Sequence, residues 1–266
     1  MAFATNDGVR IHYEVEGSGP PLLLVHGRGW SMKDWYRAGF PDALKDEFQV
    51  VLVDTRGFGE SDKPHDPKLY GQAQFMDDML AVLDELGIHS THYWGYSMGG
   101  KLGWALAINH PDRLRSVVIG EYPALGDEVT PEDQYRWEAQ SKILHAGIDM
   151  YVAALEMGVG RLPDYQRERT LAIDPVALAC QQLGNFYWGG TQEQVREIDL
   201  PMFIYTGADR PAGSFDNVAR TRDSAAMVRN ARYHQFDIKG HEPTFAACDQ
   251  VAPLVRAFLR EVDLAG

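Results

Sequence analysis

Short apolar runs alternate with longer amphipathic segments along most of the chain. Runs of this kind at 22–25, 48–53 and 114–120 are typical of strands buried on both faces of a parallel sheet. Between them, residues 72–86 carry apolar positions at helical spacing, which are Phe75, Met79, Val82, Leu83 and Leu86. The alternation predicts an α/β fold with a mostly parallel eight-stranded sheet and helices on both faces.

The strand and helix alternation stops near Tyr122 and resumes at Pro201. Helix starts occur in this interval at Thr130-Pro131 and Asp174-Pro175, each with a capping side chain before a first-turn proline, and a short helix is expected from Thr191. The pattern predicts a core formed by 1–121 and 201–266, with a helical cap inserted over 122–200.

Composition and charge narrow the classes of partner. The 266 residues carry a formal net charge of −13, which argues against nucleic acid and against an anionic membrane as partners. Cys180 and Cys248 are the two cysteines, and we expect reduced thiols rather than a disulfide. Residues 1–7 do not resemble a signal peptide and no apolar run approaches the ~20 residues of a membrane span, so a cytoplasmic monomer or homodimer is the expectation.

Gly95-Tyr96-Ser97-Met98-Gly99-Gly100 is the stretch with the strongest chemical content. It lies between an apolar run and a helical segment, which is the context of the G-x-S-x-G nucleophile elbow. Such a turn holds the serine in a strained conformation that exposes its hydroxyl, and this requires small flanking residues. A glycine-rich turn with an incidental serine is the alternative for this motif alone.

A serine hydroxyl needs a base to accept its proton, and the base needs a third group that fixes its tautomer. Among nine histidines, His241 lies just past the last predicted strand, which makes it the candidate base. Asp209 follows the penultimate strand and is the favoured acid, while Glu121 and Asp216 are competing carboxylates.

Two backbone N–H groups are needed to stabilise an oxyanion. The residue after the serine, Met98, would supply one, and Arg28 would supply the other, with Gly27 and Gly29 allowing the turn. His26 is expected to be a structural hydrogen-bonding residue. The sequence contains neither H-E-x-x-H nor a cysteine pair at ligand spacing, and the 54–61 loop lacks the phosphate-binding Gly-Lys-Ser/Thr pattern, so no cofactor and no metal are expected.

The chain resembles the α/β-hydrolase superfamily over essentially its whole length. The motifs that carry the resemblance are His26-Gly27, Asp54-x-Arg56-Gly57-x-Gly59-x-Ser61, Gly95-x-Ser97-x-Gly99-Gly100, Gly207-x-Asp209 and Gly240-His241. The resemblance implies Ser97 as nucleophile, His241 as base, Asp209 as orienting acid and the N–H groups of Arg28 and Met98 as oxyanion hole.

The serine also selects among branches of that superfamily. Haloalkane dehalogenases and epoxide hydrolases use an aspartate nucleophile, so Ser97 argues against both. The Ser-Met-Gly-Gly elbow resembles the carboxylesterase, enol-lactonase and perhydrolase-like group, which implies hydrolysis of a small or medium ester or lactone. Two alternatives stay open, a carbon–carbon bond hydrolase of vinylogous diketones and a ligand-sensing receptor. The former often carries Asn where this chain has Tyr96.

Candidate substrate contacts are aromatic, with one cation. The Arg28 guanidinium could pair with a substrate carboxylate, or it could point to solvent or to a carboxylate of the cap. Most cap aromatics are expected to pack between helices, but some must cover the site. The candidates are Trp30, Tyr96, Trp137, Phe186 and Trp188.

Overall fold

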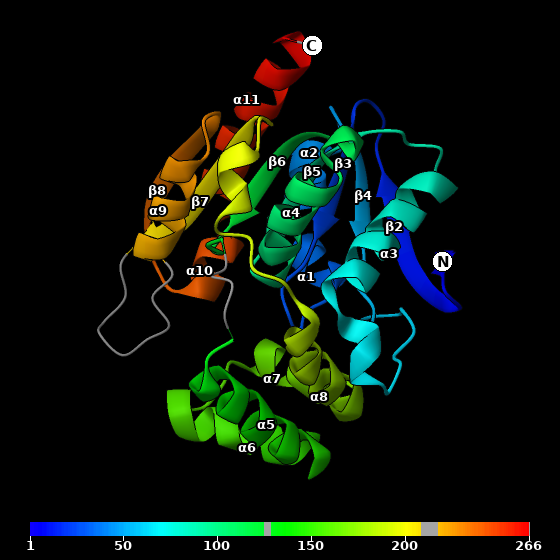
Figure 1. Cartoon of the computed structure of the whole chain (residues 1–266), viewed down its shortest axis with the longest axis vertical. Helices are drawn as coiled ribbons and strands as arrows, with labels where there is room; N and C mark the ends of the chain where they lie inside the picture. Colours follow the sequence, from blue (N-terminus) through cyan, green and yellow to red (C-terminus); the bar gives the residue numbers. More distant parts are fainter. Residues whose placement is uncertain (125–128, 209–217, 266) are drawn as a thin grey trace.

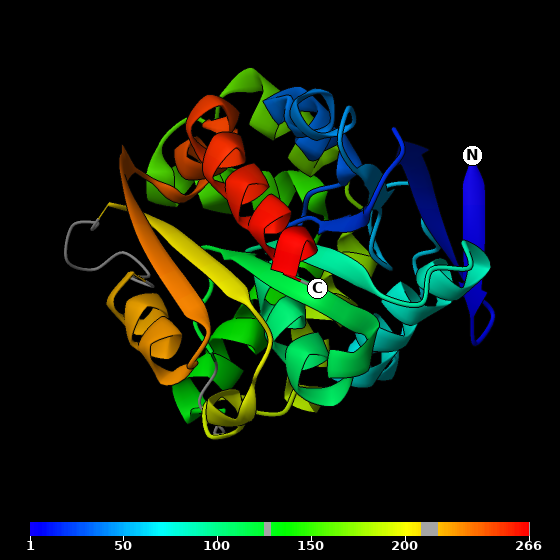
Figure 2. The same cartoon turned by 90° about the horizontal axis from the view of Figure 1, so that it is seen from above.

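An eight-stranded sheet forms the centre of the computed structural model, which describes residues 1–124, 129–208 and 218–265. The strand order is β1-β2-β4-β3-β5-β6-β7-β8, and the six strands from β3 to β8 run parallel (Figures 1 and 2). The predicted α/β architecture with eight strands is confirmed. The strands are β1 Ala2–Asn6, β2 Val9–Glu16, β3 Pro21–Val25, β4 Gln49–Val53, β5 Thr91–Tyr96, β6 Leu114–Gly120, β7 Met202–Ala208 and β8 Ala231–Lys239.

Helices cover both faces of the sheet. In Figure 2, α1, α2 and α11 lie on one side, and α3, α4 and α9 lie on the other. Strand β3 explains why both faces must be covered, because Leu22 and Leu24 pack into the first layer while Leu23 and Val25 pack into the second. These helices are α1 Met32–Ala38, α2 Phe40–Leu44, α3 Gln72–Glu85, α4 Met98–Asn109, α9 Val218–Met227 and α11 Cys248–Ala265.

The helix expected near 32–45 is divided in two. Gly39 has φ 86, a left-handed conformation that ends α1, and Pro41 lies in the first turn of α2. A further short helix, α10 (His241–Ala246), was not expected and begins at the candidate base. The single-turn 3₁₀ helices in the core are η1 Pro67–Tyr70 and η2 Pro111–Arg113.

Between β6 and β7 lie α5 to α8, which we call the inserted helices (Figure 1). Their bounds are α5 Pro131–His145, α6 Ile148–Val159, α7 Asp164–Leu171 and α8 Pro175–Gly184, followed by the 3₁₀ helices η3 Asn185–Tyr187 and η4 Gln194–Glu197. Both predicted caps are present, because the side chains of Thr130 and Asp174 accept hydrogen bonds from backbone N–H groups of the first turn. The limits 122–200 of a separate cap domain stay a prediction. Across the described residues, no helix has the length and hydropathy that crossing a bilayer requires.

Candidate active site

Ser97 lies on the turn between β5 and α4, with φ 55 and ψ −113. Few residues other than glycine adopt a positive φ, so the surrounding structure must hold this strained conformation. A Cβ on Gly95 would lie 2.1 Å from the Gly99 carbonyl oxygen, and one on Gly99 would lie 2.2 Å from the Val25 carbonyl oxygen. The turn therefore tolerates no side chain at either flanking position, which confirms the steric argument for the elbow.

The loop after β3 passes directly beside the serine. A Cβ on Gly27 would lie 3.3 Å from Cβ of Ser97. His26 is fully buried, its Nε2 accepts a hydrogen bond from the Thr55 N–H at 3.1 Å, and its Nδ1 lies 2.8 Å from the Gly27 carbonyl oxygen. Because Nε2 is the acceptor, Nδ1 carries the proton and donates it to that carbonyl. Burial lowers the pKa of His26, which favours this neutral form.

The bond from His26 also orients the next amide. The two polar groups of a trans peptide point in opposite directions, so holding the Gly27 carbonyl toward His26 directs the Arg28 N–H away from it. Met98 opens α4, where backbone N–H groups have no partner within the helix. Both predicted oxyanion donors thus belong to segments next to Ser97, and His26 has the structural position that the sequence led us to expect.

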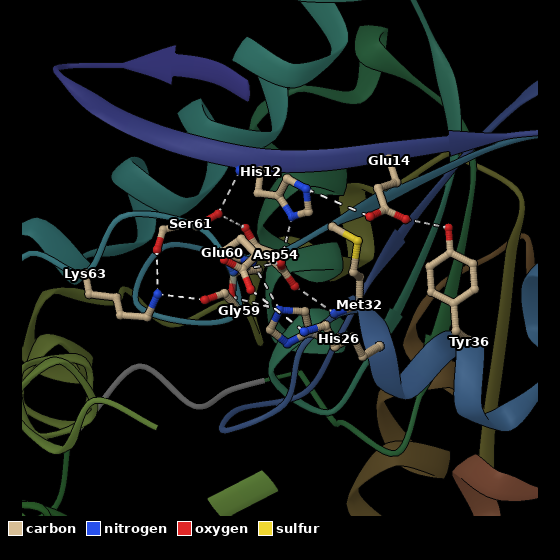
Figure 3. Close-up of polar contacts among 12 residues, drawn as sticks. His12, Glu14, His26, Met32, Tyr36, Asp54, Gly59, Glu60, Ser61 and Lys63 are labelled. Carbon is tan, nitrogen blue, oxygen red and sulfur yellow. Dashed lines mark hydrogen bonds and ion pairs between the residues drawn. The ribbon is translucent and has the colours of Figure 1, made fainter. Parts of the chain in front are cut away.

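Asp54 holds the end of the same loop through the Met32 N–H, as Figure 3 shows. Its buried carboxylate accepts hydrogen bonds from the Met32 N–H at 2.8 Å and the Glu60 N–H at 3.0 Å, and it lies 2.9 Å from Nδ1 of His12. A Cβ on Gly59 would lie 2.1 Å from the Asp54 carboxyl carbon, so this loop closes tightly around the carboxylate. The 54–61 segment therefore supports the loop between β3 and α1.

His241 follows β8 and directs its ring toward the elbow. Gly240 has φ 111, and this left-handed turn reverses the chain before α10. The Tyr96 hydroxyl donates to the His241 carbonyl oxygen at 2.5 Å, and the two rings lie 5.0 Å apart. The residue that precedes the candidate nucleophile thus positions the candidate base.

Glu121 is the carboxylate that contacts the base. Its Oε2 lies 3.2 Å from Nδ1 of His241, and its Oε1 accepts the Gly207 N–H at 2.6 Å. Only 1% of Glu121 is exposed, and its φ of 58 bends the chain sharply after β6. Asp209, the acid favoured from the sequence, and Asp216 both lie outside the described residues, so their roles stay predictions. The structure brings the competing carboxylate, Glu121, to His241.

The predicted aromatic contacts lie in three places. Trp30 and Tyr96 are buried, stack with ring centroids 5.7 Å apart and surround His241. Trp137 on α5 packs edge-to-face on Phe186, of which 37% is exposed. Trp188 is buried against the core, with its Nε1–H donating to the Tyr70 carbonyl oxygen.

Comparison with known proteins supports the fold. A family model described as the alpha/beta hydrolase fold matches residues 20–140, which include the loop after β3 and the turn that carries Ser97. The enol-lactonase from Burkholderia xenovorans LB400 superposes with a TM-score of 0.82 at 24% identity, over 97% of this chain and 100% of that one. The chain adopts the α/β-hydrolase fold.

Curated relatives of this α/β-hydrolase match it to different extents. The 2-hydroxymuconate semialdehyde hydrolase of Pseudomonas putida is 26% identical over 271 residues, which cover 96% of this chain and 92% of that protein. Bifunctional epoxide hydrolase 2 of Rattus norvegicus is 32% identical over 131 residues, so the match spans 48% of this chain and about a quarter, 24%, of that longer protein. At the coarse level that these similarities support, the α/β-hydrolase is a hydrolytic enzyme.

Three side chains near the site of this α/β-hydrolase were not predicted. Arg169 on α7 donates to Asp34 Oδ1 at 3.0 Å and Glu242 Oε1 at 2.5 Å, and so ties the inserted helices to the segment that carries the candidate base. Nothing in the polar sequence of α7 distinguishes this arginine from its neighbours. Lys101 and Gln181 are buried beside the elbow. Lys101 could have been singled out from the sequence, because it is the one charged residue in α4.

No group of three or more His, Cys, Asp or Glu side chains suited to a metal ion occurs in the ranges 1–124, 129–208 and 218–265.

Proposed function

We propose that the protein is a serine hydrolase that cleaves a small or medium carboxylic ester or lactone through an acyl-enzyme. The observation that carries this proposal is the strained Ser97 elbow beside the Gly27–Arg28 peptide, together with the His241–Glu121 contact. A strained nucleophile has a free-energy cost, and a binding role alone would give no reason to retain it.

In the proposed reaction the Ser97 hydroxyl oxygen attacks the acyl carbon, and Nε2 of His241 accepts its proton. The Arg28 and Met98 N–H groups stabilise the oxyanion of the tetrahedral intermediate. When this intermediate collapses, the bond to the alkoxy oxygen breaks and His241 protonates the leaving alcohol. A water molecule then attacks the acyl-enzyme by the same route, which releases the carboxylic acid and restores the serine hydroxyl.

The carboxylate opposite Nδ1 holds the tautomer in which Nε2 is free to accept a proton, and it stabilises the imidazolium that forms. The contact at 3.2 Å supports Glu121 in this role, and Asp209 is the acid predicted from the sequence. The losses of kcat/KM in Glu121→Gln and in Asp209→Asn, measured separately, decide between the two carboxylates.

Hydrolysis of p-nitrophenyl esters from acetyl to decanoyl tests the proposal. Wild type should show a clear optimum of acyl length, and Ser97→Ala should lower kcat by ~10³-fold or more. Ser18→Ala, an exposed serine in the loop before β3, is the matched control and should retain wild-type rates. Equal inactivity of folded wild type and Ser97→Ala on every ester would overturn the ester proposal.

Carbon–carbon bond hydrolysis is the second candidate, because a 2-hydroxymuconate semialdehyde hydrolase matches nearly the whole chain. Vinylogous diketones should then be cleaved by wild type and not by Ser97→Ala, while the p-nitrophenyl series reacts slowly or not at all. Faster turnover of the best ester than of any diketone would rule this candidate out.

A further inference from the structure

Lys101 lies one helical turn beyond the candidate nucleophile. Its backbone N–H donates to the Ser97 carbonyl oxygen at 2.9 Å, and it stands three positions after Met98, so the two side chains share a face of α4. Only 7% of Lys101 is exposed. A lysine is rarely buried to this extent without a carboxylate partner.

The contacts of Lys101 leave its charge uncompensated. Nζ donates to Asn185 Oδ1 at 2.8 Å and lies 4.0 Å from the ring centre of Trp188. Neither contact carries a formal negative charge, and Lys101 forms no ion pair with any carboxylate of the described residues. Burial, and then the neighbouring guanidinium of Arg28, lower the pKa of Lys101 to about 7.

Arg28 adds a second cation to the same region. Its backbone N–H is a proposed oxyanion donor, and its Nη1 donates to Gln140 Oε1 on α5 at 3.3 Å. Its guanidinium is likewise without an ion-pair partner among the described residues. The guanidinium is close enough to lower the pKa of Lys101, and neither cation has a counter-charge among the described residues, so the two form a local field that an anion would stabilise.

Gln181 on α8 supplies an independent sign of a missing ligand. Only 2% of the residue is exposed, and among the described residues its Nε2 donates only to the thioether sulfur of Met98 at 3.4 Å. A thioether is a weak acceptor, so the buried Nε2 keeps a donating capacity that an anion could use. This amide therefore lies beside the oxyanion segment with hydrogen-bonding capacity that the protein does not use.

We propose that Lys101, Arg28 and Gln181 form a carboxylate-binding subsite beside Ser97, so that the natural substrate is an ester or lactone that also carries a free carboxylate. The inference rests on the proposed hydrolase function and names its substrate class. The lysine and the arginine neutralise the anion, and Nε2 of Gln181 donates a hydrogen bond to one of its oxygens. Before the substrate binds, the uncompensated charge of Lys101 lowers the stability of the folded protein.

A matched pair of six-carbon acyl esters tests the subsite, namely mono-p-nitrophenyl adipate and p-nitrophenyl hexanoate, each corrected for spontaneous hydrolysis. Wild type should have a higher kcat/KM for the adipate. In Lys101→Met, which keeps the length of the side chain and removes its charge, the ratio of the two kcat/KM values should fall at least tenfold. Lys33→Met, a lysine on α1 with 75% of its side chain exposed, is the control and should keep the wild-type ratio.

An unchanged ratio in Lys101→Met would overturn the subsite. Equal losses on both esters would also overturn it, because they would indicate a structural role for the lysine. A wild-type preference for hexanoate would contradict the proposed substrate class.

Calorimetric binding of adipate to Ser97→Ala separates this inference from the proposed function, since it requires no turnover. Binding should weaken at least tenfold when Lys101→Met is added. Binding that depends on Lys101 in a protein that cleaves neither ester would support the subsite and refute the esterase proposal. Turnover of both esters without Lys101-dependent adipate binding would support the esterase and refute the subsite.

Discussion

Nδ1 of His241 lies 3.2 Å from Oε2 of Glu121, across the carboxyl ends of two strands that are not neighbours in sequence. Glu121 directly follows β6 and His241 follows β8, so the contact spans the two strand ends on either side of β7. The acid in contact with the candidate base therefore comes from a strand that precedes the inserted helices. From this position we expect Glu121 to be the acid that orients His241.

Glu121→Gln should lower kcat/KM of ester hydrolysis by ~10²-fold to 10⁴-fold, because the amide can hold His241 in the wrong tautomer and cannot stabilise the imidazolium. Asp209→Asn is the comparison, since the sequence favoured Asp209 as the acid that orients His241. Steady-state kinetics on the best p-nitrophenyl ester measure both variants. A larger loss in Asp209→Asn than in Glu121→Gln would return the acid role to Asp209.

His26→Phe should lower kcat by ~10²-fold to 10³-fold, the usual effect of losing one oxyanion donor. Without the Nδ1–H bond, the Gly27 carbonyl can turn and carry the Arg28 N–H away from the site. KM should change much less, because the donor acts on charge that develops in the transition state. A rise in KM at constant kcat would show that His26 serves substrate binding instead.

Lys101→Met should raise the free energy of unfolding by about 2 kcal/mol at pH 6, because it removes a buried charge that has no counter-charge in the described part of the chain. The folded-state pKa of Lys101, about 7, lies below its ordinary value of 10.5, so between these values the unfolded chain binds more protons. The stability of wild type relative to the variant therefore rises with pH through this window. The extra free energy of unfolding of Lys101→Met should accordingly shrink toward pH 10.

Urea unfolding of wild type and Lys101→Met at pH 6, 8 and 10 measures this difference. Lys33→Met, at an exposed position, should show no such trend. Loss of stability in Lys101→Met at pH 6 would show that the contacts with Asn185 and Trp188 outweigh the cost of the buried charge.

Asp78→Ala should lower the free energy of unfolding by about 3 to 5 kcal/mol. The carboxylate of Asp78 on α3 accepts hydrogen bonds from Nε and Nη2 of Arg56 at 2.6 and 2.5 Å, and both side chains are almost fully buried. Removing the aspartate leaves the guanidinium without its counter-charge. Asp84→Ala, whose carboxylate is largely exposed on the same helix, should cost less than 1 kcal/mol in the same denaturant titration.

Much of the fold could be predicted because its determinants are local. Apolar runs such as 22–25 require burial on both faces, and Thr130 and Asp174 mark helix starts through bonds to the nearest turn. Helices α6 and α7 escaped prediction. Glycines begin and end α6, Pro163 precedes α7, and none of these residues supplies a side-chain cap.

The sequence by itself determined the strained elbow, because the need for glycine at positions 95 and 99 is set by atoms close in the chain or in the adjoining strand. It could not determine the partner of His241. Asp209 and Glu121 both follow strands, and only the register of β6, β7 and β8 brings Oε2 of Glu121 to the imidazole. Nor could it reveal that Lys101 is buried without a counter-charge among the described residues. Its burial and its contacts depend on Asn185 and Trp188, which lie far from it in sequence and meet it only in the folded chain.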